Sequence, residues 1–331
     1  MIAPLFHIGY HKTATTWFQR ALYPHVRNRR YVPQAQVRHA LITPNALHFD
    51  PAIARQIVSS EGGIPICCEE NLTGGLHSGG LAGCQSKDIA HRIHASFPDA
   101  HIVIFVRDQV DAIAAAYVQY VKGGGTHGVD RYLFGAARLG PRAPERDEIP
   151  RFQFEHFAYD RLIAQYDALF GEARVHVYRY EHFRADRRAF MAHFARHHDL
   201  DIALDKVDFS VANPGLSVRL LRAMRVANRF TRRAVADKSH LVHLPGWYKL
   251  SRRAMRQIAA SGWNGRSAKA SDILPTSLIQ SIRHRFRASN AWLDERMARQ
   301  DRRLAARPEP EAMAAGRADF DLCLSTAETF R

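Results

Sequence analysis

Short apolar segments alternate with longer amphipathic segments along the first two thirds of the chain. Four runs rich in β-branched and aromatic residues predict buried strands: Leu5–Tyr10, Ile64–Cys68, His101–Val106 and Arg174–Tyr180. The intervening segments have helical composition, namely Thr15–Leu22, Ser86–Phe97, Val110–Val121 and Phe157–Phe170. This alternation predicts an α/β fold, a three-layer parallel sheet with helices on both faces, in which ligands bind at the carboxyl ends of the strands.

The strand pattern ends near residue 210, and helical periodicity takes its place. We expect helices over Ser217–Arg233, Tyr248–Ala260 and Thr276–Arg303. We therefore expect a single domain over residues 1–331. It would have an α/β core at 1–210, a basic helical cap at 211–305 and a tail at 306–331.

Composition is that of a globular protein, with 46% hydrophobic residues in a chain of 331. The chain has 47 Lys and Arg against 32 Asp and Glu, a net charge of +15. Residues 210–331 hold 23 of the basic and 10 of the acidic residues, so the last third of the chain carries +13 of that charge. Such charge would suit a nucleic-acid-binding protein, but neither an RRM signature nor zinc-finger spacing is present, and we expect no nucleic acid as partner.

Targeting and redox features are few. The four cysteines, Cys67, Cys68, Cys84 and Cys323, form no CxxC pair, and no ligand cluster for a metal is evident. The first residues lack the basic and apolar regions of a signal peptide, and no run of about 18 apolar residues occurs. We expect a cytoplasmic protein whose basic, amphipathic segment Ser217–Arg233 suits an acidic membrane surface or another anion.

The stretch from Phe6 to Gln19, FHIGYHKTATTWFQ, is a strand that runs through a turn into a helix opening with Thr15 and Thr16. Unpaired N–H groups at a helix start, beside hydroxyls and the Lys12 ammonium, form a cradle for a phosphate-like anion. The Walker A pattern requires a glycine directly before the lysine and Ser or Thr directly after it. His11 precedes Lys12 instead, so a P-loop small-molecule kinase is a weaker alternative.

GYHKTATTW resembles the 5′-phosphosulfate loop of sulfotransferases that use 3′-phosphoadenosine 5′-phosphosulfate (PAPS). The resemblance implies that Lys12 reaches the oxygen bridging phosphorus and sulfur and stabilises the departing phosphate. It also implies that PAPS is bound by the loop residues His11, Lys12, Thr13, Ala14, Thr15 and Thr16. Ala14 stands where the family has glycine.

A second signature of the family binds the 3′-phosphate with an Arg at a strand end, a Ser eight residues later and an aromatic residue two further on. Arg107 and Tyr117 match this spacing, whereas Ala115 occupies the serine position. The arginines of Ser217–Arg233 are candidates to replace the lost hydroxyl.

The strand IPICC ends in Glu69, Glu70 and Asn71. Transfer to a hydroxyl asks for a base near the acceptor oxygen. Glu70 matches the glutamate found at this strand end in many bacterial and carbohydrate sulfotransferases. Glu69 and His11 are the alternatives. Bacterial members of the sulfotransferase family are also similar at Tyr180 and Glu181 and in the segments NPGLS and FRASNAWL.

We therefore expect a PAPS-dependent sulfotransferase with Lys12 and Glu70 as catalytic residues and Arg107 as a PAPS ligand, working without a metal. The family implies a carbohydrate, glycolipid or other small-molecule hydroxyl as acceptor, and the basic cap suits an anionic one.

Overall fold

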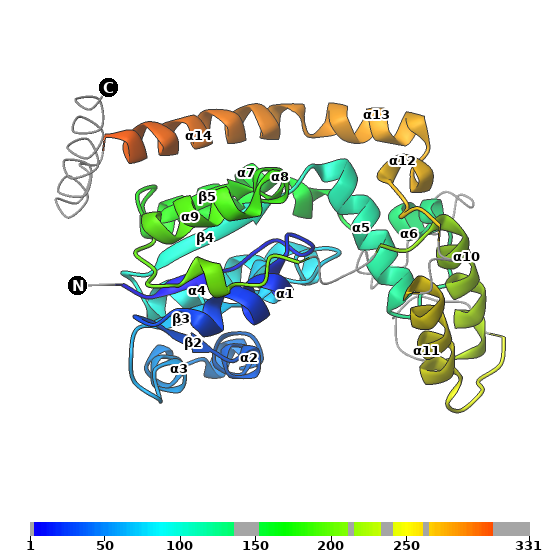
Figure 1. Ribbon diagram of the computed structural model, residues 1–331, viewed down its shortest axis with the longest axis horizontal. Helices are drawn as coiled ribbons and strands as arrows, with labels where there is room; N and C mark the ends of the chain where they lie inside the picture. The colour runs from blue at the N-terminus through cyan, green and yellow to red at the C-terminus, as the bar shows by residue number, and fades with distance from the viewer. Residues whose placement is uncertain (1–2, 136–151, 211–214, 233–240, 261–264, 307–331) are drawn as a thin grey trace, which may run out of the picture.

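The computed structural model describes residues 3–135, 152–210, 215–232, 241–260 and 265–306. Its centre is one parallel sheet of five strands in the order β2-β3-β1-β4-β5 (Figure 1). The strands are β1 (Leu5–His7), β2 (Arg30–Val32), β3 (Pro65–Cys68), β4 (His101–Val106) and β5 (Val175–Arg179). The α/β fold class predicted from the sequence is confirmed.

The central strand is β1, with His7 in register with Cys68 of β3 and Val103 of β4. Pairing continues beyond the strand, because the N–H groups of Ile8 and Tyr10 donate to carbonyls of β4 at 3.0 and 2.9 Å. The carboxyl ends of β3, β1 and β4 thus lie beside one another, which is where a parallel sheet positions its site.

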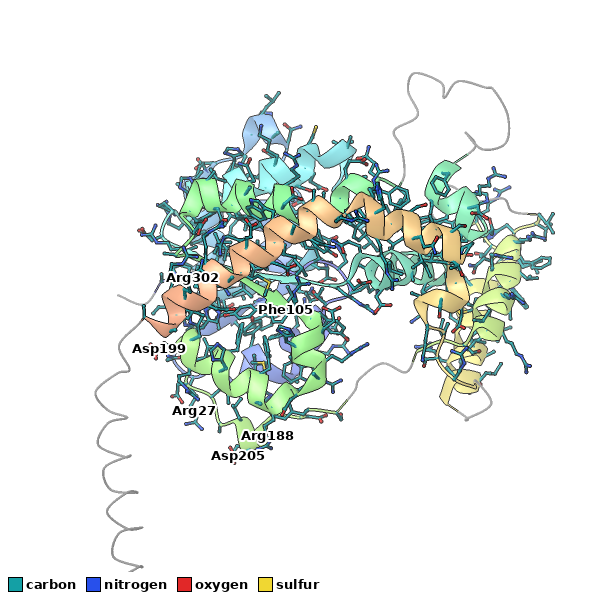
Figure 2. The ribbon with its side chains drawn as sticks, turned by 90° about the horizontal axis from the view of Figure 1, so that it is seen from above. Arg27, Phe105, Arg188, Asp199, Asp205 and Arg302 are labelled. Atoms are coloured by element: carbon teal, nitrogen blue, oxygen red, sulfur yellow. The ribbon has the colours of Figure 1, made fainter. Side chains whose placement is uncertain are left out.

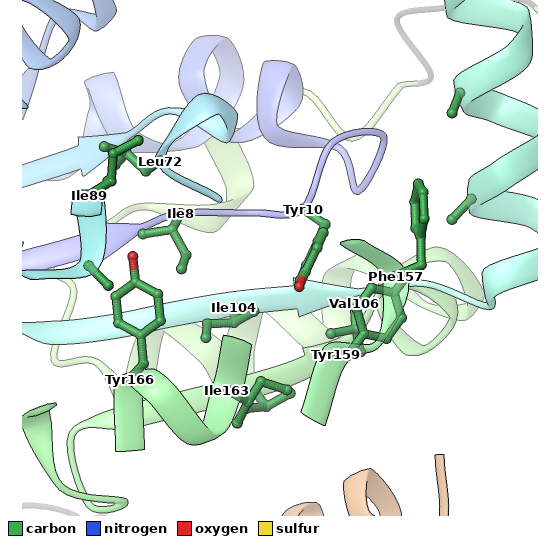
Figure 3. Packing of buried hydrophobic residues seen from close by; sticks show 14 of the residues in the cluster. Ile8, Tyr10, Leu72, Ile89, Ile104, Val106, Phe157, Tyr159, Ile163 and Tyr166 are labelled. Atoms are coloured by element: carbon green, nitrogen blue, oxygen red, sulfur yellow. The ribbon is translucent and has the colours of Figure 1, made fainter. Parts of the chain in front are cut away.

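Helices cover both faces of the sheet. One face packs against α1 (Thr15–Trp17), the π-helix that continues it (Phe18–Leu22), α8 (Tyr180–Ala185) and α9 (Arg187–His197). The other packs against α2 (Gln34–Leu41), α3 (Pro51–Val58), α4 (Cys84–Ser96), α5 (Gln109–Lys122) and α7 (Tyr159–Phe170). Figure 3 shows this second core, where Ile104 and Val106 of β4 lie near Tyr159 and Ile163 of α7. Alternate residues of β1 serve the two faces, as a doubly covered strand requires.

The helices of the predicted cap, residues 211–305, are α10 (Val218–Ala227), α11 (Trp247–Ala260), α12 (Ala270–Ile273), α13 (Thr276–Arg285) and α14 (Arg287–Ala305). The short helix α6 (Val129–Phe134), which follows α5, lies beside them (Figure 1). Of these helices, α10, α12 and α13 pack directly against α5. None of the helices in the described ranges is both long and apolar enough to cross a membrane.

The last described helix, α14 (Arg287–Ala305), lies along the outer strand β5 (Figures 1 and 2). The Gln300 side chain accepts from the N–H of Val177 at 2.8 Å and donates to its carbonyl at 3.0 Å. The fully buried Arg296 donates to both carboxylate oxygens of Asp167 at 2.7 Å. Gln300 thus occupies both backbone groups of Val177 on the outer edge of β5, where another strand could otherwise pair, and Arg296 joins α14 to α7.

Several predicted elements differ in extent. β2 carries no long apolar run and was not predicted. The helix expected over Thr276–Arg303 is two helices that meet at Phe286, and the one expected over Ser217–Arg233 ends at Ala227 before a 3₁₀ turn. On α10, Leu220, Met224 and Ala227 are buried as predicted, but Ala223 is exposed. The segment NPGLS, which resembles bacterial sulfotransferases, lies partly outside the described residues, as does the predicted tail.

Candidate active site

The loop after β1 is held in a tight conformation by three residues with positive φ: Gly9 at 73°, Lys12 at 68° and Ala14 at 71°. A Cβ on Gly9 would lie 2.9 Å from Cγ2 of Thr15, so glycine is needed here for space as well as for φ. Ala14 stands where the family that this loop resembles has glycine, and it adopts the left-handed conformation that glycine favours. This conformation costs an alanine about 1 kcal/mol.

The same loop presents backbone donors. Within the described chain, no carbonyl accepts from the N–H groups of Lys12 and Ala14. Thr15 and Thr16 start a helix whose first N–H groups point out of its end. Thr13, in contrast, is fully buried and its hydroxyl donates to the carbonyl of Tyr10, which closes the loop. The arrangement is a concave set of amides suited to a phosphate group.

Lys12 points toward α5. Its Nζ donates to Oε1 of Gln119 at 2.6 Å. Although the residue as a whole is exposed, the surrounding protein desolvates the ammonium, and this together with nearby Lys122 lowers the pKa of Lys12 to about 8. Glu70 opposes the shift, and Arg107 adds to it. The lysine is thus positioned by an amide and surrounded by positive charge, which favours a bound anion.

Arg107 follows the last residue of β4, and its Nη1 donates to the carbonyl of Lys12 at 3.3 Å. The guanidinium lies 5.1 Å from the centre of the Tyr180 ring, and Nη2 is 3.9 Å from the Asp111 carboxylate. Its Nε is buried without a partner in the described chain. Arg107 is therefore fixed beside the β1 loop, where its guanidinium can contact an anion bound to that loop.

The two other residues of the predicted 3′-phosphate signature take different positions on α5. Ala115 is partly exposed, whereas Tyr117 is buried. The Tyr117 hydroxyl donates to the carbonyl of His127 at 3.1 Å and accepts from Nη1 of Arg225 at 3.2 Å. Arg225 belongs to the basic helix α10, so one arginine of the cap does reach the signature.

The two adjacent glutamates have different surroundings. Glu69 is fully buried, and its carboxylate accepts from Arg38 at 2.7 Å, from Gln34 at 2.9 Å and from Asn71. Glu70 is partly exposed; Gln19 donates to its Oε2 at 3.2 Å, and Oε1 has no donor among the described residues. Glu69 therefore anchors β3 to α2, and Glu70 has the carboxylate oxygen free to accept a proton.

His11 lies next to this anchor. Its Nε2 is 3.2 Å from Oδ1 of Asn71. The Asn71 side chain is oriented by a hydrogen bond that its Nδ2 donates to the Glu69 carboxylate. Because an amide oxygen only accepts, Nε2 carries the proton and Nδ1 has the lone pair. That Nδ1 is buried without a partner in the described chain, and burial lowers the pKa of His11. His11 is a neutral imidazole turned into the protein rather than toward solvent.

A cavity of about 210 Å³ lies on the other side of Tyr10, between α4 and α7. His156, Ser86 and Gln165 are among its lining residues, but Lys12, Glu70 and Arg107 are not. The candidate site is instead the loop-lined surface at the carboxyl ends of β3, β1 and β4. This surface is where the chemically suitable groups converge.

Comparison with known proteins gives one match to a protein family. The model of a sulfotransferase family matches residues 88–206, a segment that includes Arg107 and Tyr117 and begins after Lys12 and Glu70. The predicted family resemblance is confirmed. This match supports a sulfotransferase, and therefore a transferase enzyme.

One solved structure, a sulfotransferase from Alicyclobacillus acidocaldarius, is similar with 18% identity and a TM-score of 0.45, over 68% of this chain and 93% of that one. No curated protein matches the chain.

Three contributors to the candidate site were not predicted: Gln119, Lys122 and the contact made by Arg225. Gln119 and Lys122 lie four and seven residues after Ala115, so they share its face of α5. That spacing is the signal by which the sequence could have indicated them. The contact of Arg225 depends on how α10 packs against α5, and no sequence spacing encodes it.

Proposed function

We propose that this protein transfers a sulfuryl group from PAPS to an acceptor hydroxyl. The observation that carries the proposal is the convergence of Lys12, Arg107 and Glu70 at the ends of three adjacent strands. A cation pair and a free carboxylate beside an amide-lined loop are the groups that this reaction requires.

The donor would bring its own activated sulfuryl group, so the protein needs only to bind, orient and stabilise charge. The β1 loop would hold the 5′-phosphate through its N–H groups and Thr16. Arg107, held beside the β1 loop by its bond to the carbonyl of Lys12, would bind the 3′-phosphate. A further cation, Arg225, contacts the Tyr117 hydroxyl and adds positive charge near α5.

Lys12 would stabilise the negative charge that grows on the phosphate oxygen as it leaves. Gln119 holds the ammonium by a single hydrogen bond, which a stronger anionic partner can replace. Fixed cations and dipoles that meet developing charge contribute strongly to catalysis because they need no reorganisation during the reaction.

Glu70 would take the proton of the acceptor hydroxyl. Its carboxylate is partly exposed and Gln19 fixes one oxygen, which leaves the other directed to a partner outside the protein. Glu69 has no oxygen without donors, and the basic nitrogen of His11 is buried. These contacts favour Glu70 over both alternatives.

For the acceptor we propose a sugar hydroxyl, of a carbohydrate or glycolipid, and the positive charge of the cap supports an anionic one. A cytoplasmic location is part of the proposal, and the free thiols of Cys67 and Cys68 suit a reducing compartment.

Calorimetry with adenosine 3′,5′-bisphosphate, ATP with Mg²⁺ and duplex DNA tests the donor. We expect binding of the bisphosphate, weakened roughly tenfold or more by Lys12→Ala and by Arg107→Ala, because each removes a charged hydrogen-bond donor. Lys206→Ala and Arg184→Ala, which remove exposed cations elsewhere, are the matched controls. Preference for ATP with Mg²⁺ or for DNA, or unchanged binding in both site variants, would overturn the proposal.

A transfer assay with PAPS and a panel of neutral and anionic sugars then tests the reaction itself. We expect a sulfate ester and adenosine 3′,5′-bisphosphate in equal amounts. Binding of the bisphosphate without transfer to any hydroxyl in the panel would reject the proposed acceptor class while leaving the donor site intact.

A further inference from the structure

Four histidines gather at the amino ends of two neighbouring strands, at the opposite edge of the sheet from Lys12. His101 is the first residue of β4 and His176 lies near the start of β5, while His197 and His198 form the carboxyl end of α9. Figure 2 labels Asp199, the next residue, at the end of the molecule toward which α14 runs. The cluster takes no part in the proposed sulfuryl transfer.

Three of these histidines are arranged around one point. One ring nitrogen from each of His176, His197 and His198 lies within 4.8 Å of the others. The ring centres are 4.7 Å apart for His176 and His197, 4.7 Å for His176 and His198, and 4.6 Å for His197 and His198. Three imidazoles at a tetrahedral metal place their nitrogens about 3.3 Å apart, so small side-chain adjustments suffice.

The closest pair is already near that spacing. Nδ1 of His176 and Nε2 of His197 are 2.9 Å apart and must share one proton between them. If the ring that holds this proton carries it on its other nitrogen instead, both facing nitrogens present a lone pair to a divalent cation and both imidazoles stay neutral.

The Nε2 atoms of His176 and His198 have hydrogen-bond partners of the kind that orient histidines at metal sites. Nε2 of His176 is 2.8 Å from Nδ1 of His101, and Nε2 of His198 is 2.9 Å from the Tyr178 hydroxyl. Such bonds fix the orientation and tautomer of the two rings, as the outer partners of ligand histidines do in metal sites.

Burial also favours binding. His176 and His198 are each 5% exposed, and His197 is partly exposed, which leaves a path for an ion.

We propose that His176, His197 and His198 bind a divalent transition-metal ion such as Zn²⁺, with water as the fourth ligand. Imidazole nitrogen suits zinc, copper and nickel rather than magnesium or calcium. The ion would join the end of α9 to β5 and so stabilise this end of the sheet. The sequence led us to expect no metal, because His176 lies 21 residues before His197 and no ligand spacing links it to the adjacent pair His197 and His198.

Titration of the tag-free, full-length protein with ZnCl₂ after chelator treatment tests the site. We expect one Zn²⁺ per chain by calorimetry and a melting temperature raised by several degrees. His197→Ala should weaken Zn²⁺ binding at least tenfold and abolish the shift in melting temperature, while binding of adenosine 3′,5′-bisphosphate stays unchanged.

The matched control is His193→Ala, which removes an exposed imidazole one turn earlier on α9, 6.4 Å from the His197 ring. It should bind Zn²⁺ as the natural chain does. Circular dichroism of metal-free His197→Ala verifies that it is folded, and Co²⁺ spectra of the natural chain should show the absorption of a tetrahedral site. Absence of binding, equal binding in His197→Ala, or equal loss in His193→Ala would overturn the proposal.

Discussion

The ammonium nitrogen of Lys12 lies 2.6 Å from the side-chain oxygen of Gln119, which joins the loop after β1 to the helix after β4. This bond directs the lysine along the exposed face of α5, beside Lys122. The two proposed phosphate-binding regions, one in the loop and one at Arg107 and α5, are thereby brought into a single site. The first prediction concerns the charge of this lysine.

Binding of adenosine 3′,5′-bisphosphate should weaken as the pH rises through about 8, because the lowered pKa of Lys12 means that its ammonium loses its proton there. Above that value the dissociation constant should rise by up to about tenfold per pH unit. Calorimetry between pH 6.5 and 9.5 measures the effect. Lys12→Arg, whose guanidinium stays charged, should remove the pH dependence, and Lys206→Ala should retain it. An unchanged profile in Lys12→Arg would contradict the assignment.

The two glutamates should separate catalysis from stability. Glu70→Gln should lower kcat by about 10²- to 10³-fold with little change in melting temperature, because it removes the proposed base but no buried ion pair. Glu69→Gln should instead destabilise the fold by about 2–3 kcal/mol, because a buried carboxylate loses its charge beside Arg38. Transfer kinetics and urea unfolding measure the two effects, and the reverse pattern would assign the base to Glu69.

His11→Gln distinguishes the remaining alternative for the base. With its basic nitrogen buried, His11 should affect kcat less than Glu70 does when each is replaced by glutamine. The expected loss is within about tenfold, which reflects a displaced loop. A larger loss than in Glu70→Gln would identify the histidine as the proton acceptor.

Ala115→Ser should strengthen binding of the 3′-phosphate. Ala115 is partly exposed on α5, so a hydroxyl there can donate to a phosphate near Arg107. One added hydrogen bond predicts roughly three- to tenfold tighter binding of adenosine 3′,5′-bisphosphate. AMP, which lacks the 3′-phosphate, should bind equally to both proteins, and Ala192→Ser on α9 should change neither affinity. Tighter binding of AMP as well would place the 3′-phosphate elsewhere.

Ala14→Gly should stabilise the fold by up to about 1 kcal/mol, because glycine adopts the φ of 71° without the cost that alanine bears. Ala192→Gly, in the middle of α9, should instead destabilise by about 1 kcal/mol. Urea unfolding of both variants measures the difference. If Ala14→Gly lowers stability as much as Ala192→Gly does, residue 14 does not hold the left-handed conformation.

The residues of the site could be predicted where chemistry and strand ends coincide in the sequence. Lys12, Glu70 and Arg107 each follow an apolar run, and parallel strands bring such positions to one edge of a sheet. The different roles of Glu69 and Glu70 could not be predicted, because both directly follow β3 and only the packing of α2, which brings Arg38 to Glu69, distinguishes them.

The sequence by itself determined the alternating α/β plan, the basic cap and the motif that matches sulfotransferases, since these depend on periodicity and short-range spacing. Only the tertiary structure decided which side chains meet across the chain: Gln119 with Lys12, Arg225 with Tyr117, and the histidines of β5 with those of α9. The physical reason is that such contacts depend on how elements far apart in sequence pack together. Neither the hydrophobic pattern nor the residue spacing determines the distance between two such side chains.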